Sequence, residues 1–138
     1  MQLKVKLRHD AFMLERAHAT DAGLDIRTPE AFTLAAHGSE VIATGVYVEL
    51  PRGTAGMLKS KSGLNVVHDI TSDGVIDEGY SGEITVKLYN HGDRPHRFER
   101  GDKVSQLVIV PVMYADPVEV DSITGGERGA NGLGSTGR

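Results

Sequence analysis

The sequence contains no cysteine and no tryptophan, and aromatic residues make up only 5% of its 138 residues. Without cysteine the chain can form neither disulfides nor thiolate–metal sites. Because aromatic residues are few, valine, isoleucine and leucine must fill the core, and a hydrophobic fraction of 39% is enough for one core. The sequence therefore predicts a single domain that does not depend on disulfides.

Long hydrophobic runs are also missing. The longest, from Leu107 to Met113, is far shorter than the roughly 20 residues that a membrane-spanning helix needs. Charged residues interrupt the N-terminal stretch, which does not resemble a signal peptide, so the predicted location is the cytoplasm. A formal net charge of −4 argues against a general nucleic-acid-binding surface, which is usually basic. We therefore expect neither a membrane nor a nucleic acid as partner, whereas a single nucleotide needs only a few local cations.

The periodicity of the chain indicates many short strands. Residues 11–19 could form a short helix on composition, and a second short helix is expected at residues 64–68. Many short strands with frequent turn signals favour an all-β sandwich or barrel. Alternation of apolar and polar residues predicts strands at residues 3–7, 46–50 and 84–89, and Val118 and Val120 suggest one more short strand at residues 118–120. The continuous apolar run at residues 107–112 predicts a strand that is buried on both faces.

The last fourteen residues, Gly125 to Arg138, differ from the rest of the chain. Six of them are glycine, and the only large apolar residue among them is Leu133. Such a segment cannot bury enough surface to offset the entropy lost when it becomes ordered. We expect a β domain over residues 1–124 and a flexible arm over residues 125–138. The arm is either a disordered tail or a segment that orders over a ligand.

Five segments combine glycine with a polar residue that could serve a phosphate or a metal. Taken alone, Asp25 could support Mg²⁺ through water, with an ordinary turn aspartate as the alternative. The turn Lys61-Ser62-Gly63 offers a cation, a hydroxyl and a backbone N–H to phosphate oxygens, with a solvated turn as the alternative. In chain order the five segments are Asp21–Ile26, Lys59–Leu64, Gly74–Ile84, Arg100–Leu107 and Arg128–Gly137.

The third segment holds Asp77 between apolar residues and glycine. A carboxylate beside apolar residues can act as a general base on water, although a hairpin loop with a solvated aspartate would look the same locally. In the fourth segment Gln106 lies among apolar residues, where a buried amide must find a partner. The run Gly132–Gly137 matches the dinucleotide fingerprint G-x-G-x-x-G, but the helix and βαβ unit that the fingerprint requires cannot follow it.

Taken together, the five segments resemble, in order and approximate spacing, the five motifs of the trimeric dUTPases over about residues 3 to 137. The resemblance implies an all-β, jelly-roll-like β-sandwich or distorted barrel with a flexible C-terminal arm. It implies a homotrimer with active sites at the subunit contacts. It also implies that water attacks the α-phosphorus of dUTP to give dUMP and pyrophosphate, which limits uracil in DNA and supplies dUMP for thymidylate synthesis.

The resemblance also assigns roles to residues. Asp77 would orient and deprotonate the water, Asp25 would support Mg²⁺ through water, and Tyr80 would pack under the deoxyribose and disfavour a 2′-hydroxyl. The other predicted substrate-binding residues are Lys61, Ser62 and Gly63 in the phosphate-binding turn, Thr71, Gly74, Val75, Ile76 and Thr85 around the base, Gln106 on a phosphate, and Arg128, Leu133, Gly134, Ser135 and Thr136 in the arm that closes over the phosphates.

The sequence departs from the family pattern in places, including Thr71, where bacterial members often have asparagine, and Ser81, which replaces a frequently basic residue. Lys61 stands where many members carry arginine, and it keeps the charge without the bidentate fork. Leu133 stands where many carry a ring that stacks on uracil. Two alternative functions remain: a dCTP deaminase-type enzyme of the same fold, and a dUTPase-like regulatory protein that acts by binding a partner protein. The complete set of motifs, with Asp77 present, favours the dUTP diphosphatase.

Overall fold

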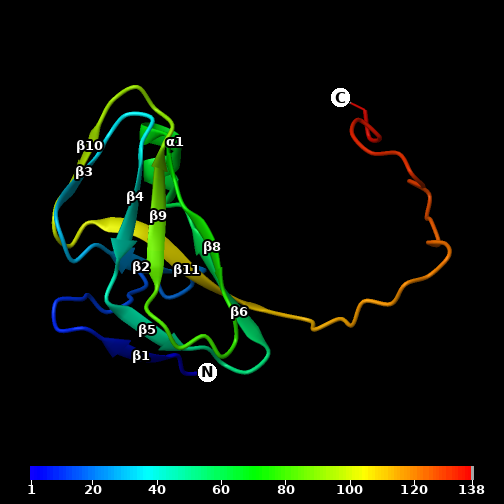
Figure 1. Ribbon diagram of the computed structural model, residues 1–138, viewed down its shortest axis with the longest axis horizontal. Coiled ribbons are helices and arrows are strands. Elements are labelled where there is room, and N and C mark those ends of the chain that lie inside the picture. Colours follow the sequence, from blue (N-terminus) through cyan, green and yellow to red (C-terminus); the bar gives the residue numbers. More distant parts are fainter. Residues whose placement is uncertain (138) are drawn as a thin grey trace.

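Residues 1–137, which the computed structural model describes, form eleven strands and one short helix (Figure 1). The strands pair antiparallel in two larger sheets, β2-β11-β6-β8 and β4-β9-β7, and in two pairs, β1-β5 and β10-β3. The all-β prediction is confirmed, and the sheets form a distorted sandwich. The elements are β1 (Lys4–Leu7), β2 (Gly23–Arg27), β3 (Phe32–Leu34), β4 (Ser39–Ala43), β5 (Val46–Glu49), β6 (Thr54–Lys59), α1 (Ser62–His68), β7 (Ile70–Thr71), β8 (Asp73–Ile76), β9 (Thr85–Asn90), β10 (His96–Phe98) and β11 (Lys103–Pro111).

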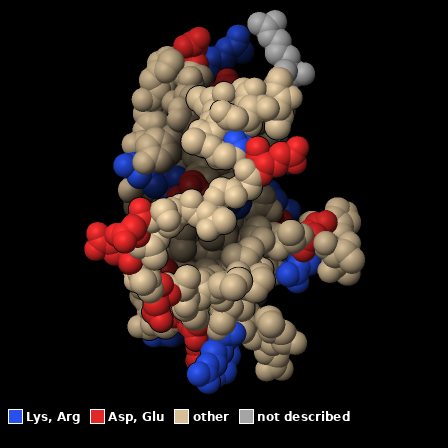
Figure 2. Space-filling view, turned by 90° about the vertical axis from the view of Figure 1, so that its right-hand side faces the viewer, with Lys and Arg blue, Asp and Glu red and all other residues tan. Residues whose placement is uncertain are grey.

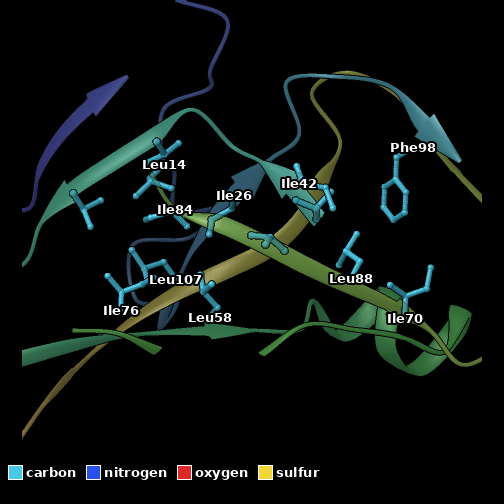
Figure 3. Close-up of a cluster of buried hydrophobic side chains, with 14 of the residues drawn as sticks. Leu14, Ile26, Ile42, Leu58, Ile70, Ile76, Ile84, Leu88, Phe98 and Leu107 are labelled. Atoms are coloured by element: carbon cyan, nitrogen blue, oxygen red, sulfur yellow. The ribbon is translucent and has the colours of Figure 1, made fainter. Parts of the chain in front are cut away.

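The core lies between the two larger sheets. On β9 the alternation of the sequence is reproduced in space, because Val86 and Leu88 are buried while Lys87 between them is exposed. Figure 3 shows Leu58 and Leu107 from one sheet and Leu88 from the other as members of the same cluster of buried side chains. Each fully buried leucine or isoleucine contributes roughly 1.5–3 kcal/mol. This core holds together the two sheets that carry many of the predicted site residues.

The position of β11 in its sheet brings three of the predicted segments together. Gln106 on β11 lies opposite Asp25 of β2 on one side and opposite Lys59 of β6 on the other. Strand β8 then pairs with the far edge of β6, where Asp73 lies opposite Lys59. Residues from separate parts of the sequence therefore become neighbours through the strand register.

The strands predicted at residues 3–7, 46–50 and 84–89 are confirmed, and α1 confirms the helix predicted at residues 64–68. The predicted strand at residues 107–112 is part of β11, which begins earlier, at Lys103. Its predicted burial on both faces is wrong for the second half of the strand. There Val108, Ile109 and Val110 are only partly buried, because this end lines an open surface pocket.

Two other predicted elements are wrong. Residues 11–19 form no helix, since this stretch runs beside the middle of β2, where the carbonyl of Glu15 accepts the Asp25 N–H at 2.7 Å. The stretch Val118 to Val120 forms no strand. It lies beyond the last sheet, so no neighbouring strand of the same chain is there to pair with it.

After β11 the chain leaves the body of the domain (Figure 1). Residues 112–137 contain no helix or strand, and nearly all of them are exposed. The predicted arm falls within this stretch, apart from residue 138, which lies outside the described residues. Within residues 1–137, no helix is long and apolar enough to cross a membrane.

Candidate active site

The segment that follows β8 forms a cleft of about 510 Å³ against the exposed side of β4 and β9, and we call it the hairpin cleft. Asp77 comes directly after β8, and its side chain is exposed at this cleft. Strands β8 and β9 belong to different sheets, and the segment that joins them brings residues of both strands to the same cleft. Six predicted residues line the hairpin cleft: Gly74, Val75, Ile76, Asp77, Tyr80 and Thr85.

The tip of the hairpin is a tight turn that carries Tyr80. The Tyr80 N–H donates to the Asp77 carbonyl at 3.1 Å, and the Tyr80 hydroxyl donates to the Glu83 carbonyl at 3.0 Å. Gly82 makes this geometry possible, since a Cβ atom there would lie 2.4 Å from the Tyr80 oxygen. The tyrosine ring is therefore fixed close to Asp77 by bonds at both its backbone and its hydroxyl.

A second group of predicted residues meets around Asp25, whose exposed fraction is only 4%. The Lys61 ammonium donates to one of its carboxylate oxygens, and the Lys103 ammonium lies 2.6 Å from the other. Burial alone would raise the pKa of Asp25, but the hydrogen bonds from Lys103 and Lys61 outweigh it and lower the pKa below its usual value. Asp25 is thus a carboxylate that holds two ammonium groups side by side, with a net charge of +1 for the three residues.

Gln106 completes this second group. Its side-chain amide donates to the Ser60 carbonyl at 2.9 Å, so the partner expected for this amide is present. Gly23 lies so close that a Cβ atom there would be 2.0 Å from the Gln106 side-chain oxygen. The absence of a side chain on β2 therefore makes room for the glutamine on β11.

Three serines join the hairpin to the phosphate turn. The Ser60 hydroxyl donates to the Ser72 carbonyl at 3.1 Å and accepts the Ser72 N–H at 2.9 Å. The hydroxyls of Ser72 and Ser105 lie 2.8 Å apart, and Ser105 also donates to the Lys59 carbonyl at 3.0 Å. These bonds fix the end of β6, just before Lys61, against the start of β8.

The group around Asp25 opens on a different cleft, of about 540 Å³, whose wall includes Lys61, Gly63, Lys103 and Arg27. No residue lines both this cationic cleft and the hairpin cleft. Within one chain, the hairpin around Asp77 and the residues suited to phosphate are therefore presented at separate openings.

The remaining predicted residues are not gathered at either cleft. The Thr71 hydroxyl lies 2.7 Å from His91 Nε2 and lines neither opening, and Ser62 is exposed at the start of α1. Arg128 donates to the carbonyls of Asn131 and Gly132 of its own arm, both at 2.8 Å. Figure 1 shows the arm, which carries Arg128, Leu133, Gly134, Ser135 and Thr136, pointing away from the body.

The stretch between β11 and the arm, in contrast, is fixed beside the segment that follows β8. The Tyr114 hydroxyl and the Gly53 N–H both donate to the Glu78 carboxylate, the latter at 2.9 Å. The bond from Tyr114 is the main reason why the pKa of Glu78 is lowered. The chain therefore passes Glu78, the neighbour of Asp77, before the arm begins, and the arm itself extends away from the body (Figure 1).

Several residues that line the clefts are absent from the sequence-based prediction. Val41, Glu83 and Lys87 lie in the hairpin cleft, and Lys103 binds Asp25. The exposed face of the strand that alternates over residues 84–89 was a signal for Lys87. For Lys103 the signal was weaker, since the register places it opposite Arg27, and only its long side chain brings the ammonium to Asp25, two residues along β2.

The residues do not by themselves form a magnesium site. Within residues 1–137, no three histidine, aspartate or glutamate side chains gather closely enough to hold a metal. The one predicted supporting residue, Asp25, already has both carboxylate oxygens bound by lysines. Mg²⁺ is commonly held by one or two carboxylates together with substrate phosphates and water, so most of its ligands here would have to come from the substrate and solvent.

Figure 2 shows the face from which the arm leaves, and among the described residues acidic and basic side chains alternate there with uncharged surface.

The sequence is similar to those of known dUTPases. The dUTPase family model matches residues 9–137. The deoxyuridine 5′-triphosphate nucleotidohydrolase of Gloeothece citriformis is 40% identical, and the alignment covers 99% of this chain and 97% of that protein. The enzyme of the same name from Clostridium acetobutylicum is 42% identical with the same coverage.

Solved structures give the same result. The dUTPase of Staphylococcus bacteriophage 80alpha, solved with dUpNHpp, superimposes with a TM-score of 0.92 at 32% identity over 99% of each chain. A dUTPase variant from phage phi11 of S. aureus, described with a structural Mg(II) ion, gives a TM-score of 0.81 at 30% identity. That comparison covers 88% of this chain and 98% of the phage chain. This chain belongs to the dUTPase family.

Proposed function

We propose that the protein hydrolyses dUTP to dUMP and pyrophosphate. The observation that carries this proposal is the hairpin cleft, where Asp77 is exposed beside the fixed ring of Tyr80. The relatives that this chain matches over nearly its full length carry the name deoxyuridine 5′-triphosphate nucleotidohydrolase. The alternative, a dCTP deaminase-type enzyme, is not favoured by any of these relatives.

In this mechanism Asp77 orients a water molecule and takes its proton as the water attacks the α-phosphorus. General-base assistance of this kind accelerates a reaction roughly 10²–10⁴-fold. The backbone of Gly74 to Ile76 forms the wall that faces the uracil. The ring of Tyr80 packs under the deoxyribose, where a 2′-hydroxyl would clash.

The remaining acceleration comes from neutralising the charge of the triphosphate. Lys61 and Lys103, held side by side by Asp25, present two cations at the cationic cleft. Gln106 and the turn at Ser62 and Gly63 add hydrogen-bond donors. Fixed cations and donors of this kind stabilise the transition state, since they need not reorganise when charge develops. Mg²⁺, held mainly by phosphate oxygens and water with Asp25 in support, would neutralise further phosphate charge.

We also propose a homotrimer in which each active site combines parts of different chains. The phosphate-binding residues and Asp77 lie at separate openings of one chain, and the arm extends away from its own Asp77 (Figure 1). Val118 and Ile123 near the arm are 78% and 85% exposed, so contact with a neighbouring chain would cover apolar surface. In this arrangement residues 1–124 form the β domain, and residues 125–138 close over a site of another subunit with Arg128 and Ser135 near the phosphates.

The test is pyrophosphate release from a panel of deoxynucleoside triphosphates by the wild type and by Asp77→Asn. We expect the wild type to prefer dUTP, and the variant to lose roughly 10²–10⁴-fold in kcat because only the base is removed. If Asp77→Asn hydrolyses dUTP at a rate close to that of the wild type, the role of Asp77 is refuted. Release of ammonia from dCTP would instead identify the deaminase.

A further inference from the structure

The position of Tyr80 depends on a series of hydrogen bonds that begins outside the five motif segments. The ring is 47% exposed, so packing alone does not fix it. Its hydroxyl donates to the backbone carbonyl of Glu83, and Gly82 leaves the space for this bond. The position of the ring therefore depends on how firmly the backbone at Glu83 is held.

The side chain of Glu83 is held by two donors that lie just outside β1 and β5. Its Oε1 atom accepts a hydrogen bond from Arg8 Nη1 at 2.8 Å and another from the Gly45 N–H at 2.7 Å. Bonds to a charged acceptor are stronger than those between neutral groups. Next to Glu83, the Ile84 N–H donates to the Val46 carbonyl at 2.8 Å, so this end of the segment is tied to β5.

Arg8 is itself fixed on all sides. Its guanidinium donates through Nε and Nη2 to the two oxygens of Asp10, at 2.6 and 3.2 Å, while Nη1 serves Glu83. Its backbone N–H donates to the Gly45 carbonyl at 2.8 Å. Arg8 directly follows β1, so a chain of bonds runs from the first strand through Glu83 to Tyr80.

The charges explain why arginine matters at this position. Arg8 lies between two carboxylates, and its fork satisfies both at once, which a lysine could do only in part. Without the guanidinium, Asp10 and Glu83 would repel each other, and Glu83 would keep only the Gly45 bond. We expect the hairpin tip to shift in that case, although the catalytic Asp77 would remain unchanged.

We propose that Arg8 and Glu83 are positioning residues for Tyr80, and that through it they set the preference for a deoxyribose over a ribose. This inference rests on the proposed packing of Tyr80 under the sugar. Neither Arg8 nor Glu83 has to touch the substrate for this role. Both residues fix the backbone at Glu83, whose carbonyl accepts the hydrogen bond from the Tyr80 hydroxyl.

The chain offers a matched control in the ion pair between Lys4 and Glu49. This pair also joins the N-terminal region to β5, at 2.8 Å, but it lies outside the residues that line the hairpin cleft. The variants are Arg8→Met, Glu83→Gln and the control Lys4→Met. For each, kcat and KM are measured with dUTP and with UTP, together with the thermal midpoint.

For Arg8→Met we expect KM for dUTP to rise about 5-fold with kcat changed less than about 2-fold, since binding rather than chemistry is affected. The ratio of kcat/KM for dUTP over UTP should fall by about the same factor, and Arg8→Lys should recover part of it. Glu83→Gln keeps an acceptor oxygen and should show a smaller change. Lys4→Met should keep the wild-type KM and the wild-type ratio.

A lower thermal midpoint for Arg8→Met with an unchanged dUTP/UTP ratio would overturn the inference, because the pair would then be only structural. If Arg8→Met does not fold, Glu83→Gln and Arg8→Lys must still lower the ratio for the inference to hold. The variant Tyr80→Ala separates the proposed sugar contact of Tyr80 from the proposed positioning role of Arg8. If Tyr80→Ala leaves the ratio unchanged, the sugar contact itself is wrong; if it changes and Arg8→Met does not, only the positioning role fails.

Discussion

At the residue scale, Asp25 is the clearest case of a side chain with two functions, since it stabilises the fold and holds the two lysines. We predict that Asp25→Asn lowers the free energy of unfolding at pH 7 by about 2 kcal/mol, less than the roughly 3–5 kcal/mol lost when a fully buried pair is broken. The discount is due to the lysine side chains, which are 27% and 37% exposed. Urea unfolding at a fixed protein concentration measures the difference.

The same variant has a predicted pH dependence. The folded-state pKa of Asp25 is lowered, so its stabilisation is fully present above its unfolded pKa of about 3.9 and is lost as the pH falls through the folded value. The difference between the wild type and Asp25→Asn should therefore shrink below about pH 4. A difference that stays constant down to about pH 2 would contradict the ion pairs as its source.

Leu133 is the residue at which the arm departs most from the family pattern. We predict that Leu133→Phe lowers KM for dUTP by about 3-fold, because a ring can stack on the uracil where leucine offers only apolar contact. Leu133→Met is the control, since it keeps a similar apolar surface without a ring. An unchanged or higher KM for the phenylalanine variant would count against stacking at this position.

At the scale of the elements, the contact between β2 and β11 links a glycine to the phosphate site. We predict that Gly23→Ala raises KM for dUTP about as much as Gln106→Ala does, because the new Cβ atom displaces the glutamine side chain. The two nearest atoms, Gln106 Oε1 and Cδ, belong to the flexible end of the side chain, but Gln106 Cβ would also lie only 3.0 Å away, so we expect a loss of stability of about 1 kcal/mol. The double variant should be no worse than either single one, and additive effects would show that the two changes are independent.

The elements that sequence alone predicts are those with a periodic pattern of their own. Strands β1, β5 and β9 alternate clearly, whereas β3, β7 and β10 are too short to show a period. Strand β6 carries buried residues in succession around Gly56 and so lacks alternation as well. For residues 11–19 composition favoured a helix, but the pairing of Glu15 with Asp25 provides the backbone bonds instead.

The residues of the candidate site also differ in whether a local sequence pattern predicts them. The order of the motif segments predicts Asp77, Tyr80 and Lys61 as site residues, because each has a local signature within its glycine-containing segment. Lys103 and Glu83 lie in two of the same segments, but no local signature marks them there. Their contacts depend on the strand register and on a bond to Arg8, which is 75 residues away from Glu83 in the sequence.

At the scale of the whole molecule, the separation of the openings makes a prediction about mixed trimers. Asp77→Asn has an intact arm, and a chain lacking residues 125–138 has an intact Asp77. If each site takes Asp77 from one chain and the arm from another, trimers assembled from equal amounts of the two inactive chains should contain working sites. About one quarter of the sites would combine both intact parts, because each part is present in half of the chains.

An arm that closes over the site of its own chain would give no activity in the mixture. If the arm folded back over the Asp77 of its own chain, every site in the mixture would lack one of the two parts, and mixing would restore nothing. The chains are co-refolded from denaturant so that subunits exchange, and pyrophosphate release is compared with that of each chain refolded alone. A control mixture of Asp77→Asn with a chain carrying both changes should stay inactive under either assignment, since Asp77 is then absent from every site. Activity near one quarter of the wild-type value would therefore assign the arm and Asp77 of a site to different subunits.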